Sequence, residues 1–357
     1  MDFTALLQKI NTHWEQQLPF VIYAAPEHTK VNVLLQQDAT YYSAKGFNNT
    51  GFVFAPFDDK KASFCIPEVF SEKITLEVSV PSVLNTDTPF CQELTSDKEK
   101  HLVYVSEILD NIKNKTVEKV VATRKKEIPL TGFDLSELIR RIISMDTAAF
   151  RYVWYHPKTG IWCGVSPEVL LMSEGANFST MALAGTQKVT GDTTPDWGSK
   201  ETFEQQLVTN AITTNLKKIT TTLEVSSPKT HKAGSLYHIK TQIKGAFDKK
   251  ETSLAQITSV LHPTPAVCGS PRDAAFAIIQ ELEGYNREFY TGFLGPLDLQ
   301  NNTAQLYVNL RCMKISPTMA TLYVGGGITL DSMPQDEWQE TKNKMATMLS
   351  VLGSMLP

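Results

Sequence analysis

Short runs rich in Val, Ile, Phe and Tyr follow one another along the chain without a helix between them, and this constrains the fold most. Pro, Asp and Asn bound these runs, which is typical of strands. Long helical patterns are mixed with these groups of strands. The order predicts an α+β protein with sizeable antiparallel sheets, rather than a repeated βαβ unit. The predicted strands are residues 20–26, 30–37, 51–57, 62–67, 117–128, 150–156, 160–166, 237–247, 290–299, 303–315 and 321–328.

Helical apolar periods predict the other elements. An amphipathic helix opens the chain, and further helices are expected at residues 96–114, 134–145, 201–224, 273–285 and 334–353. A weak signal for a domain boundary lies at 85–97, and this stretch could separate an N-terminal lobe. We expect one intertwined domain over residues 1–357, with a strand-rich N-terminal part at 1–95 and the catalytic core at 96–357.

Charge and composition narrow the class of function. The 357-residue chain has a net charge of −4, which does not suit nucleic-acid binding and favours a small-molecule ligand or a protein partner. No apolar run approaches the roughly 20 residues that span a bilayer, and the N-terminus lacks the pattern of a signal peptide. The cysteines are scattered without a CxxC pair, so we expect reduced thiols in a cytoplasmic protein, by default a monomer. They are Cys65, Cys91, Cys163, Cys268 and Cys312.

Two acidic pairs have helical spacing. Glu201 and Glu204 lie three apart near the start of one predicted helix, and Glu337 and Glu340 do so in another, with Lys344 four residues later. Residues three apart share a helix face, so two such faces brought together would form an oxygen-rich site suited to Mg²⁺. The alternative is that these carboxylates are solvated and simply favour the positive end of a helix.

Two ionisable residues have the setting of a general base and a general acid. Lys119 lies in an apolar predicted strand, where burial would help it to accept a proton from water. Glu168 follows Ser-Pro and precedes an apolar run, where a carboxyl group can stay protonated and donate a proton. The alternatives are an edge-strand lysine that faces solvent and an ordinary turn glutamate.

Other motifs could contact a ligand. Gly185 and Thr186 directly follow a predicted strand, where glycine allows close approach to the backbone. Gly325–Gly327 offer several N–H groups to an anion, and Arg311, in a predicted strand, is a candidate clamp for a carboxylate. A flexible turn and an exposed arginine are the plainer explanations. The irregular run LHPTPAVCGSP at 261–271 is a metal loop, a nucleophile loop or a wall that shapes a substrate pocket.

The order of these motifs resembles that of the chorismate-utilising enzymes, over about residues 117–345. This family includes isochorismate synthase, salicylate synthase, anthranilate synthase component I and aminodeoxychorismate synthase. The matching blocks are KVVATR, GVSPEVLL, LAGT, ExxE before QLV, LYHI, LHPTPAVCGSP, ELEGYNREFYTGFLG, NLRCMK, VGGGI and EWQETKNK. The resemblance implies an α/β fold in which two packed antiparallel sheets are flanked by helices, with the site in a deep cleft.

The resemblance also implies a role for each motif residue. Lys119 would be the base that activates water for attack at C2 of chorismate, and Glu168 the acid that protonates the departing C4 hydroxyl. Glu204 and Glu340 would be the main Mg²⁺ ligands, supported by Glu201 and Glu337. The implied substrate contacts are Gly185, Thr186, His238, Ala266, Tyr290, Arg311, Gly325, Gly326, Gly327 and Lys344.

Three features favour a water-adding member of the family. Amine-adding relatives usually have glutamine at the position of Lys119, aminodeoxychorismate synthases have a nucleophilic lysine where this chain has Ala184, and the HPTPA form of the 261–271 loop is similar to that of isochorismate synthases. The implied reaction is a reversible, Mg²⁺-dependent conversion of chorismate to isochorismate. The loop would then be a pocket wall and Cys268 would take no part.

Other functions stay open. They are salicylate synthesis, which adds pyruvate elimination to the same first step, a glutaminase-dependent subunit, and a non-catalytic chorismate-binding protein. The chain also departs from the family in having Gln205 where many relatives have histidine, and in an extra residue near Gln300–Asn302. The first departure leaves the metal carboxylate in place but removes a histidine partner beside it.

Overall fold

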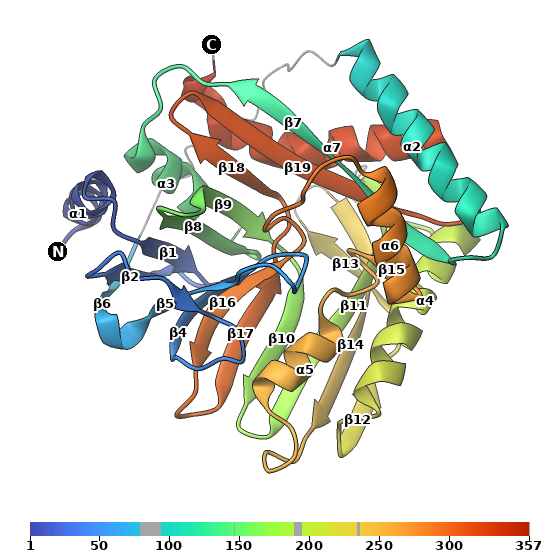
Figure 1. Ribbon diagram of the computed structural model, residues 1–357, viewed down its shortest axis with the longest axis horizontal. Coiled ribbons are helices and arrows are strands. Elements are labelled where there is room, and N and C mark those ends of the chain that lie inside the picture. Colours follow the sequence, from blue (N-terminus) through green and yellow to red (C-terminus); the bar gives the residue numbers. More distant parts are fainter. Residues whose placement is uncertain (79–93, 146, 189–194, 234–235, 357) are drawn as a thin grey trace.

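The computed structural model describes residues 1–78, 94–145, 147–188, 195–233 and 236–356 (Figure 1). Two large antiparallel sheets form the centre of the molecule, which confirms the predicted fold class. In spatial order, the nine strands described in the first sheet are β15 (Gly269–Ser270), β7 (Lys119–Pro129), β19 (Met319–Ile328), β18 (Cys312–Ser316), β9 (Gly160–Ser166), β8 (Phe150–His156), β1 (Phe20–Ala24), β2 (Lys30–Gln36) and β6 (Ser71–Glu77).

The second sheet has ten described strands. In spatial order they are β12 (Thr222–Val225), β14 (Leu236–Ala246), β11 (Asn177–Lys188), β10 (Val169–Glu174), β17 (Thr303–Val308), β16 (Phe293–Asp298), β4 (Gly51–Ala55), β5 (Phe64–Pro67) and β3 (Tyr42–Ser43), with β13 (Lys229–Ala233) also paired to β14. Strands from the first 78 residues therefore enter both sheets: β1 pairs with β8, and β4 pairs with β16.

Aromatic side chains form the layer between the two sheets. Phe150 on β8 stacks on Tyr307 of β17 with ring centroids 4.2 Å apart, and Phe54 on β4 stacks on Phe289 at 4.3 Å. Trp154 and other rings fill the same cluster. Because stacked rings bury large apolar areas, this layer fixes one sheet against the other.

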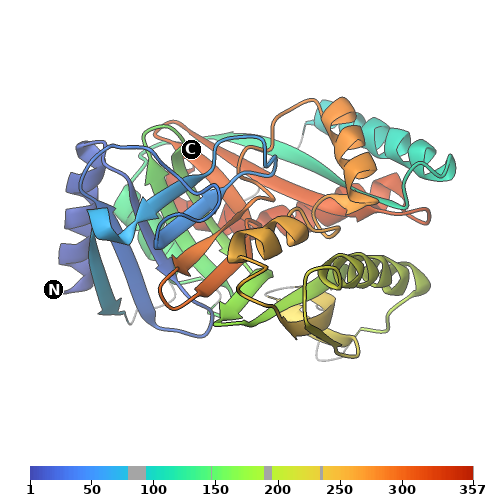
Figure 2. The same cartoon turned by 60° about the horizontal axis from the view of Figure 1, so that its bottom comes forward.

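Helices cover the outer faces of the sheets. α1 (Phe3–Glu15), α3 (Leu135–Ile143) and α7 (Pro334–Leu352) share an apolar cluster with the nine-stranded sheet. α4 (Ser199–Leu216) and α5 (Leu254–Leu261) pack on the ten-stranded sheet. α2 (Thr95–Lys113) and α6 (Arg272–Leu282) pack near β7, and Figure 2 shows them at the upper right, above α4. None of the described helices has the length and apolar character needed to cross a membrane.

Several predicted elements have different limits in the structure. The helix predicted at 201–224 ends at Leu216, and Thr222–Val225 form β12 instead. The β-branched threonines at 220–222 favour strand over helix, which explains this error. The boundary predicted at 85–97 lies largely outside the described residues, which resume at Leu94 before α2. The patterns also gave no sign of α5, β3, β6, β10, β12, β13 or β15.

The strand predicted at 303–315 is two strands in different sheets. β17 pairs with β10 and β16 in the ten-stranded sheet, whereas β18 pairs with β9 and β19 in the nine-stranded sheet. Arg311, which we had placed in a strand, lies in the connection between them and has a φ of +45°. Gly185, which we had placed after a strand, lies within β11 at a break in its register with β14.

Candidate active site

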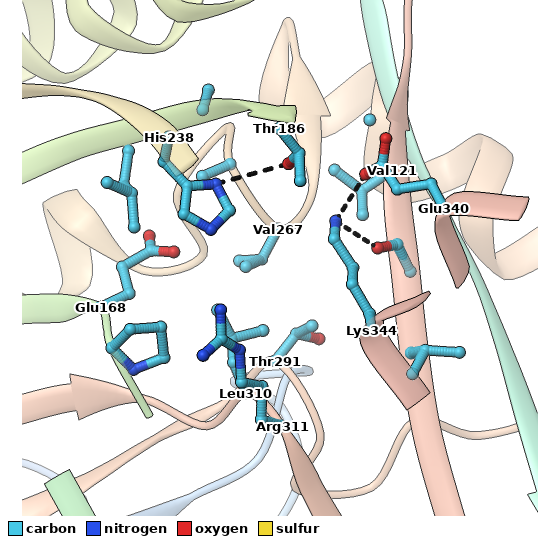
Figure 3. Close-up of a pocket in the computed structure, with 18 of the residues that line it drawn as sticks. Val121, Glu168, Thr186, His238, Val267, Thr291, Leu310, Arg311, Glu340 and Lys344 are labelled. Carbon is cyan, nitrogen blue, oxygen red and sulfur yellow. Dashed lines mark hydrogen bonds and ion pairs between the residues drawn. The ribbon is translucent and has the colours of Figure 1, made fainter. Parts of the chain in front are cut away.

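Most of the predicted site residues line one cavity that is partly open to solvent. The predicted residues in its wall are Glu168, Gly185, Thr186, Glu204, His238, Ala266, Tyr290, Arg311, Gly325, Gly326, Gly327, Glu340 and Lys344. Figure 3 shows Glu168, His238 and Arg311 on one side of the open space, with Lys344 and Glu340 on the other.

Lys119 lies directly behind this wall. It is the first residue of β7, and its side chain is only 1% exposed, so the predicted burial is confirmed. Its Nζ lies 2.8 Å from Oε1 of Glu204, which does line the cavity. A Cβ on Gly327 would overlap the Glu204 carboxylate and lie 2.7 Å from Cε of Lys119. Glycine at 327 is therefore needed for β19 to pass so close to this pair.

Glu168 is a buried carboxyl group in the connection between β9 and β10. Its main chain is fixed, because its N–H donates to Ser166 Oγ at 3.3 Å and its carbonyl accepts from the N–H of Val308 at 3.0 Å. Burial raises the pKa of Glu168 to about 8, although Lys119 and Lys344 act in the opposite direction. The side chain therefore carries a proton at neutral pH, as a general acid requires.

His238 faces the cavity from β14 as a neutral imidazole. Burial, reinforced by the positive charges of Lys344 and Arg311, lowers the pKa of His238 to about 3. Its Nδ1 lies 3.0 Å from the carbonyl oxygen of Gly185 and 3.4 Å from Oγ1 of Thr186. Since the carbonyl can only accept, Nδ1 carries the proton and Nε2 keeps a lone pair that can accept a hydrogen bond from a ligand.

Gly185 is required by the break in β11. It has a φ of +70°, a conformation that favours glycine, and a Cβ there would lie 3.0 Å from Cβ of Glu201 on α4. Its N–H donates to Oε2 of Glu204 at 3.2 Å. The break thus brings the sheet backbone against the start of α4 and helps to fix the Glu204 carboxylate.

Three of the four predicted metal ligands lie close to the glycines of β19, residues 325–327. Glu204 lies against Gly327, while a Cβ on Gly326 would be 3.0 Å from Oε2 of Glu337 and 3.5 Å from Oε1 of Glu340. Glu201 does not line the cavity, and its Oε2 lies beside Gly198 at the N-terminus of its own helix. The structure therefore brings together the two helices that carry the ExxE pairs. Three of the four carboxylates meet there, and that of Glu201 does not.

A lysine pairs with each of these three carboxylates. Lys119 pairs with Glu204, Lys200 with Glu337 at 2.8 Å, and Lys344 with Glu340 at 2.7 Å. Burial alone would raise the pKa of Glu204, but Lys119, with Lys344 and Lys200, holds it below its usual value. Burial and the nearby Glu340 raise the pKa of Glu337, although Lys200 opposes them.

The donor set fits a hard divalent cation. Oε2 of Glu337 is buried and has no hydrogen-bond partner among the described residues, although it faces Gly326 beside Glu340. Mg²⁺ takes a few carboxylates together with water and substrate oxygens, and an orphaned carboxylate oxygen offers such a ligand. Within the described ranges, no three acidic, His or Cys side chains are gathered closely enough to hold a metal by themselves. Substrate oxygens and water would have to complete the shell.

The 261–271 loop forms part of the cavity wall. Ala266 and Val267 line the cavity, and His262 Nε2 lies 3.1 Å from the carbonyl oxygens of Pro56 and Phe57, which ties the loop to the ten-stranded sheet. Cys268 is fully buried and points into the cluster under α2 and α6, where burial raises the pKa of its thiol to about 12. A thiol in this state is a poor nucleophile or metal ligand.

Some site residues carry no signal that the patterns could have used. Val121, Leu183, Thr291 and Leu310 line the cavity, but apolar and small side chains look the same in a pocket as in a core. Gln205, the departure from the family, is buried and donates to Thr209 and Thr241 at 2.8 and 2.6 Å, so it joins α4 to β14.

Comparison with known proteins identifies the family. Residues 58–353 match a family model described as chorismate binding enzyme. The chain is 34% identical over 247 residues to the isochorismate synthase EntC of Escherichia coli (strain K12), covering 66% of this chain and 63% of that relative, which is less than two thirds of its length. It is 28% identical over 318 residues to the vibriobactin-specific isochorismate synthase of Vibrio cholerae, covering 85% of this chain and 79% of the relative.

A solved structure supports the same conclusion. The fold is similar to that of DhbC from Bacillus anthracis, a candidate 2,3-dihydroxybenzoate-specific isochorismate synthase. The TM-score is 0.79 at 26% identity, over 97% of this chain and 99% of the other. From the matched family model, which spans most of its length, the chain belongs to the chorismate-binding enzymes.

Proposed function

We propose that the protein is an isochorismate synthase, which converts chorismate to isochorismate by adding water at C2 and losing the C4 hydroxyl. One observation carries this proposal. Glu168, whose pKa of about 8 keeps it protonated, lines the same cavity as Arg311, and the buried Lys119 lies behind the wall of that cavity. The names of the relatives in Escherichia coli and Vibrio cholerae support the proposal.

The cationic residues would bind the substrate. Chorismate is a dianion, and Arg311 can take one carboxylate through two parallel hydrogen bonds. Lys344 contributes positive charge on the opposite wall, where its Nζ also donates to the carbonyl of Gly325 at 2.9 Å. Ala184 and Ala266 line the cavity with small apolar side chains that leave room for the ring and offer no nucleophile.

The proton transfers can be assigned to two residues. Lys119 would take a proton from the water that attacks C2, while the ring double bonds shift and the C4–O bond breaks. Glu168 would give its proton to the departing hydroxyl, which leaves as water. The atoms balance, because one water enters and one leaves, and no oxidant is needed. The Nε2 lone pair of His238 would accept a hydrogen bond from the C4 hydroxyl and orient it.

Magnesium would be held by Glu204, Glu337 and Glu340, with Glu201 in a supporting position. When bound, it would supply positive charge for the ring carboxylate of the substrate and reduce the repulsion between that dianion and the acidic side chains. We also propose that the chain forms one domain, since its N-terminal strands pair within both sheets. The scattered cysteines favour a cytoplasmic location.

Incubation with chorismate and Mg²⁺, followed by chromatography, tests the proposed function. We expect isochorismate as the product, in equilibrium with chorismate. Salicylate and pyruvate as the only products would identify a salicylate synthase instead. Activity that required ammonia or an added glutaminase would contradict both assignments, and binding without turnover would identify a non-catalytic homologue.

Gly327→Ala is expected to lower turnover by about 100-fold, since displacements near 1 Å at a catalytic group have effects of that size. The added methyl group would collide with the Glu204 carboxylate and with Lys119. The measurements are kcat with chorismate and Mg²⁺ affinity by calorimetry. Gly132→Ala is the control, because a Cβ at Gly132 meets no atom within 4 Å, although its φ of +70° disfavours alanine. It should lose stability and keep turnover, and equal turnover in both variants would contradict the assignment.

A further inference from the structure

The chain crosses from one sheet to the other beside the cavity. β17 ends at Val308 in the ten-stranded sheet and β18 begins at Cys312 in the nine-stranded sheet, so the crossing takes only Asn309–Arg311. Leu310 and Arg311 line the cavity, and Arg311 has the left-handed φ of +45°. Figure 3 shows the guanidinium of Arg311 directed into the open space. The direction of this side chain therefore depends on how the crossing is held.

A second turn with unusual geometry lies against the crossing. Tyr290 and Thr291 line the cavity, and Thr291 is fully buried with a φ of +62°. A positive φ is a true outlier for a β-branched residue, and such strain persists only where the surroundings impose it. Something must therefore hold this turn in place.

Asn309 joins the two turns through both its backbone and its side chain. Its N–H donates to the carbonyl of Gly292 at 2.8 Å, and its carbonyl accepts from the N–H of Thr291 at 2.9 Å. Its Nδ2 donates to the carbonyl of Phe289 at 2.9 Å, and its Oδ1 accepts from the hydroxyl of Tyr152 at 2.6 Å. The residue is fully buried, so these bonds form in a dry, low-dielectric setting where geometry is strongly fixed.

We propose that Asn309 is a positioning residue that sets the direction of the Arg311 guanidinium for the substrate carboxylate. This inference rests on the proposed function, in which Arg311 binds chorismate. The amide connects the wall turn at 289–292 to the crossing, and Tyr152 anchors both to β8 of the nine-stranded sheet. Without the amide, the two backbone bonds remain, but the bonds to Phe289 and Tyr152 that fix the turns relative to the sheet are lost.

A double-mutant cycle on chorismate binding separates positioning from simple stabilisation. Chorismate affinity is measured by calorimetry in the presence of Mg²⁺ for wild type, Asn309→Ala, Arg311→Ala and the double variant. We expect Asn309→Ala to weaken binding by about 10-fold to 100-fold, because a displaced Arg311 guanidinium can no longer form both hydrogen bonds to the substrate carboxylate. The double variant should bind no more weakly than Arg311→Ala alone, since Asn309 acts through Arg311.

Gln36→Ala is the matched control. Gln36 is also a fully buried amide, and its Nε2 donates to the carbonyls of Asp38 and Thr40 at 2.9 and 2.8 Å, outside the cavity wall. This variant should lose thermal stability, as Asn309→Ala does, but keep wild-type affinity for chorismate. If Asn309→Ala does not fold, Tyr152→Phe replaces it in the cycle, because it removes only the hydroxyl that donates to Asn309.

Two results would overturn the inference alone. One is wild-type affinity in Asn309→Ala or in Tyr152→Phe, and the other is a loss that adds fully to that of Arg311→Ala. A wild-type protein that does not bind chorismate would instead overturn the proposed function, and this inference with it. The wild-type titration therefore distinguishes the two failures.

Discussion

Glu168→Gln is expected to reduce turnover of chorismate by about 10²- to 10⁴-fold, the usual contribution of a positioned general acid. Glutamine has the same shape and can still donate a hydrogen bond to the C4 hydroxyl, but it cannot transfer a proton. The affinity for chorismate should therefore change little while kcat falls. The measurements are kcat and KM by chromatography of isochorismate.

The pH dependence gives a second test of Glu168. Because its pKa is about 8, the protonated, active form is lost as pH rises through that value, and wild-type kcat should fall accordingly. The residual activity of Glu168→Gln should show no such fall. A wild-type profile that stays flat to pH 9, or a variant with full activity, would contradict the assignment of the acid.

Glu168→Gln should raise the stability of the protein at neutral pH while it lowers the activity. The pKa of Glu168 is raised from 4.5 to about 8, so the folded state retains a proton that the unfolded state releases above pH 4.5. The contribution of this group to the free energy of unfolding is therefore full at low pH and is lost as pH rises between these two values. At pH 7 the loss is on the order of 3 kcal/mol. Glu168→Gln removes this loss and should unfold at a higher temperature than wild type at pH 7, but not at pH 4. Glu174→Gln, at the exposed end of β10, should change neither property.

Lys119→Gln is expected to lower turnover by a similar factor of about 10²- to 10⁴-fold. The glutamine amide can still donate to Glu204, so the buried carboxylate keeps a partner, but it cannot accept a proton from water. We therefore expect a folded protein that binds chorismate and converts it very slowly. Circular dichroism, calorimetry and product chromatography measure these three properties.

Lys125→Gln is the control for Lys119. It lies on the same strand, but its side chain is 41% exposed and pairs with Glu127 at the surface. Surface pairs of this kind contribute little, so both turnover and stability should stay near wild type. If Lys119→Gln kept full turnover, another group would have to act as the base.

The sequence predicted those parts of the fold that depend on local patterns. Adjacent strand-like runs gave the antiparallel sheets, and helical apolar periods gave α4 and α7. The resemblance of the motif order indicated that these elements share a site, and most of the motif residues do line one cavity. The roles assigned to Lys119, Glu168 and the carboxylates stay predictions until they are measured.

The errors arose where tertiary packing overrides a local pattern. The run at 303–315 is continuous in strand-forming residues, so nothing local indicates that it divides between two sheets. At the break, Asn309 bonds to Tyr152 and Phe289, which are distant in sequence. The pairing of Lys200 with Glu337 likewise joins two helices whose relative position no spacing rule provides.

The pairing of early with late strands has a consequence for synthesis of the protein. Gly51 on β4 pairs with Leu297 on β16, so the ten-stranded sheet cannot close until most of the polypeptide has left the ribosome. Until then β4 keeps an unpaired edge and its phenylalanines stay exposed, and such nascent chains aggregate readily. Slow translation at low temperature, or a holding chaperone, should therefore raise the soluble yield, whereas fragments that end before β16 should collect in inclusion bodies.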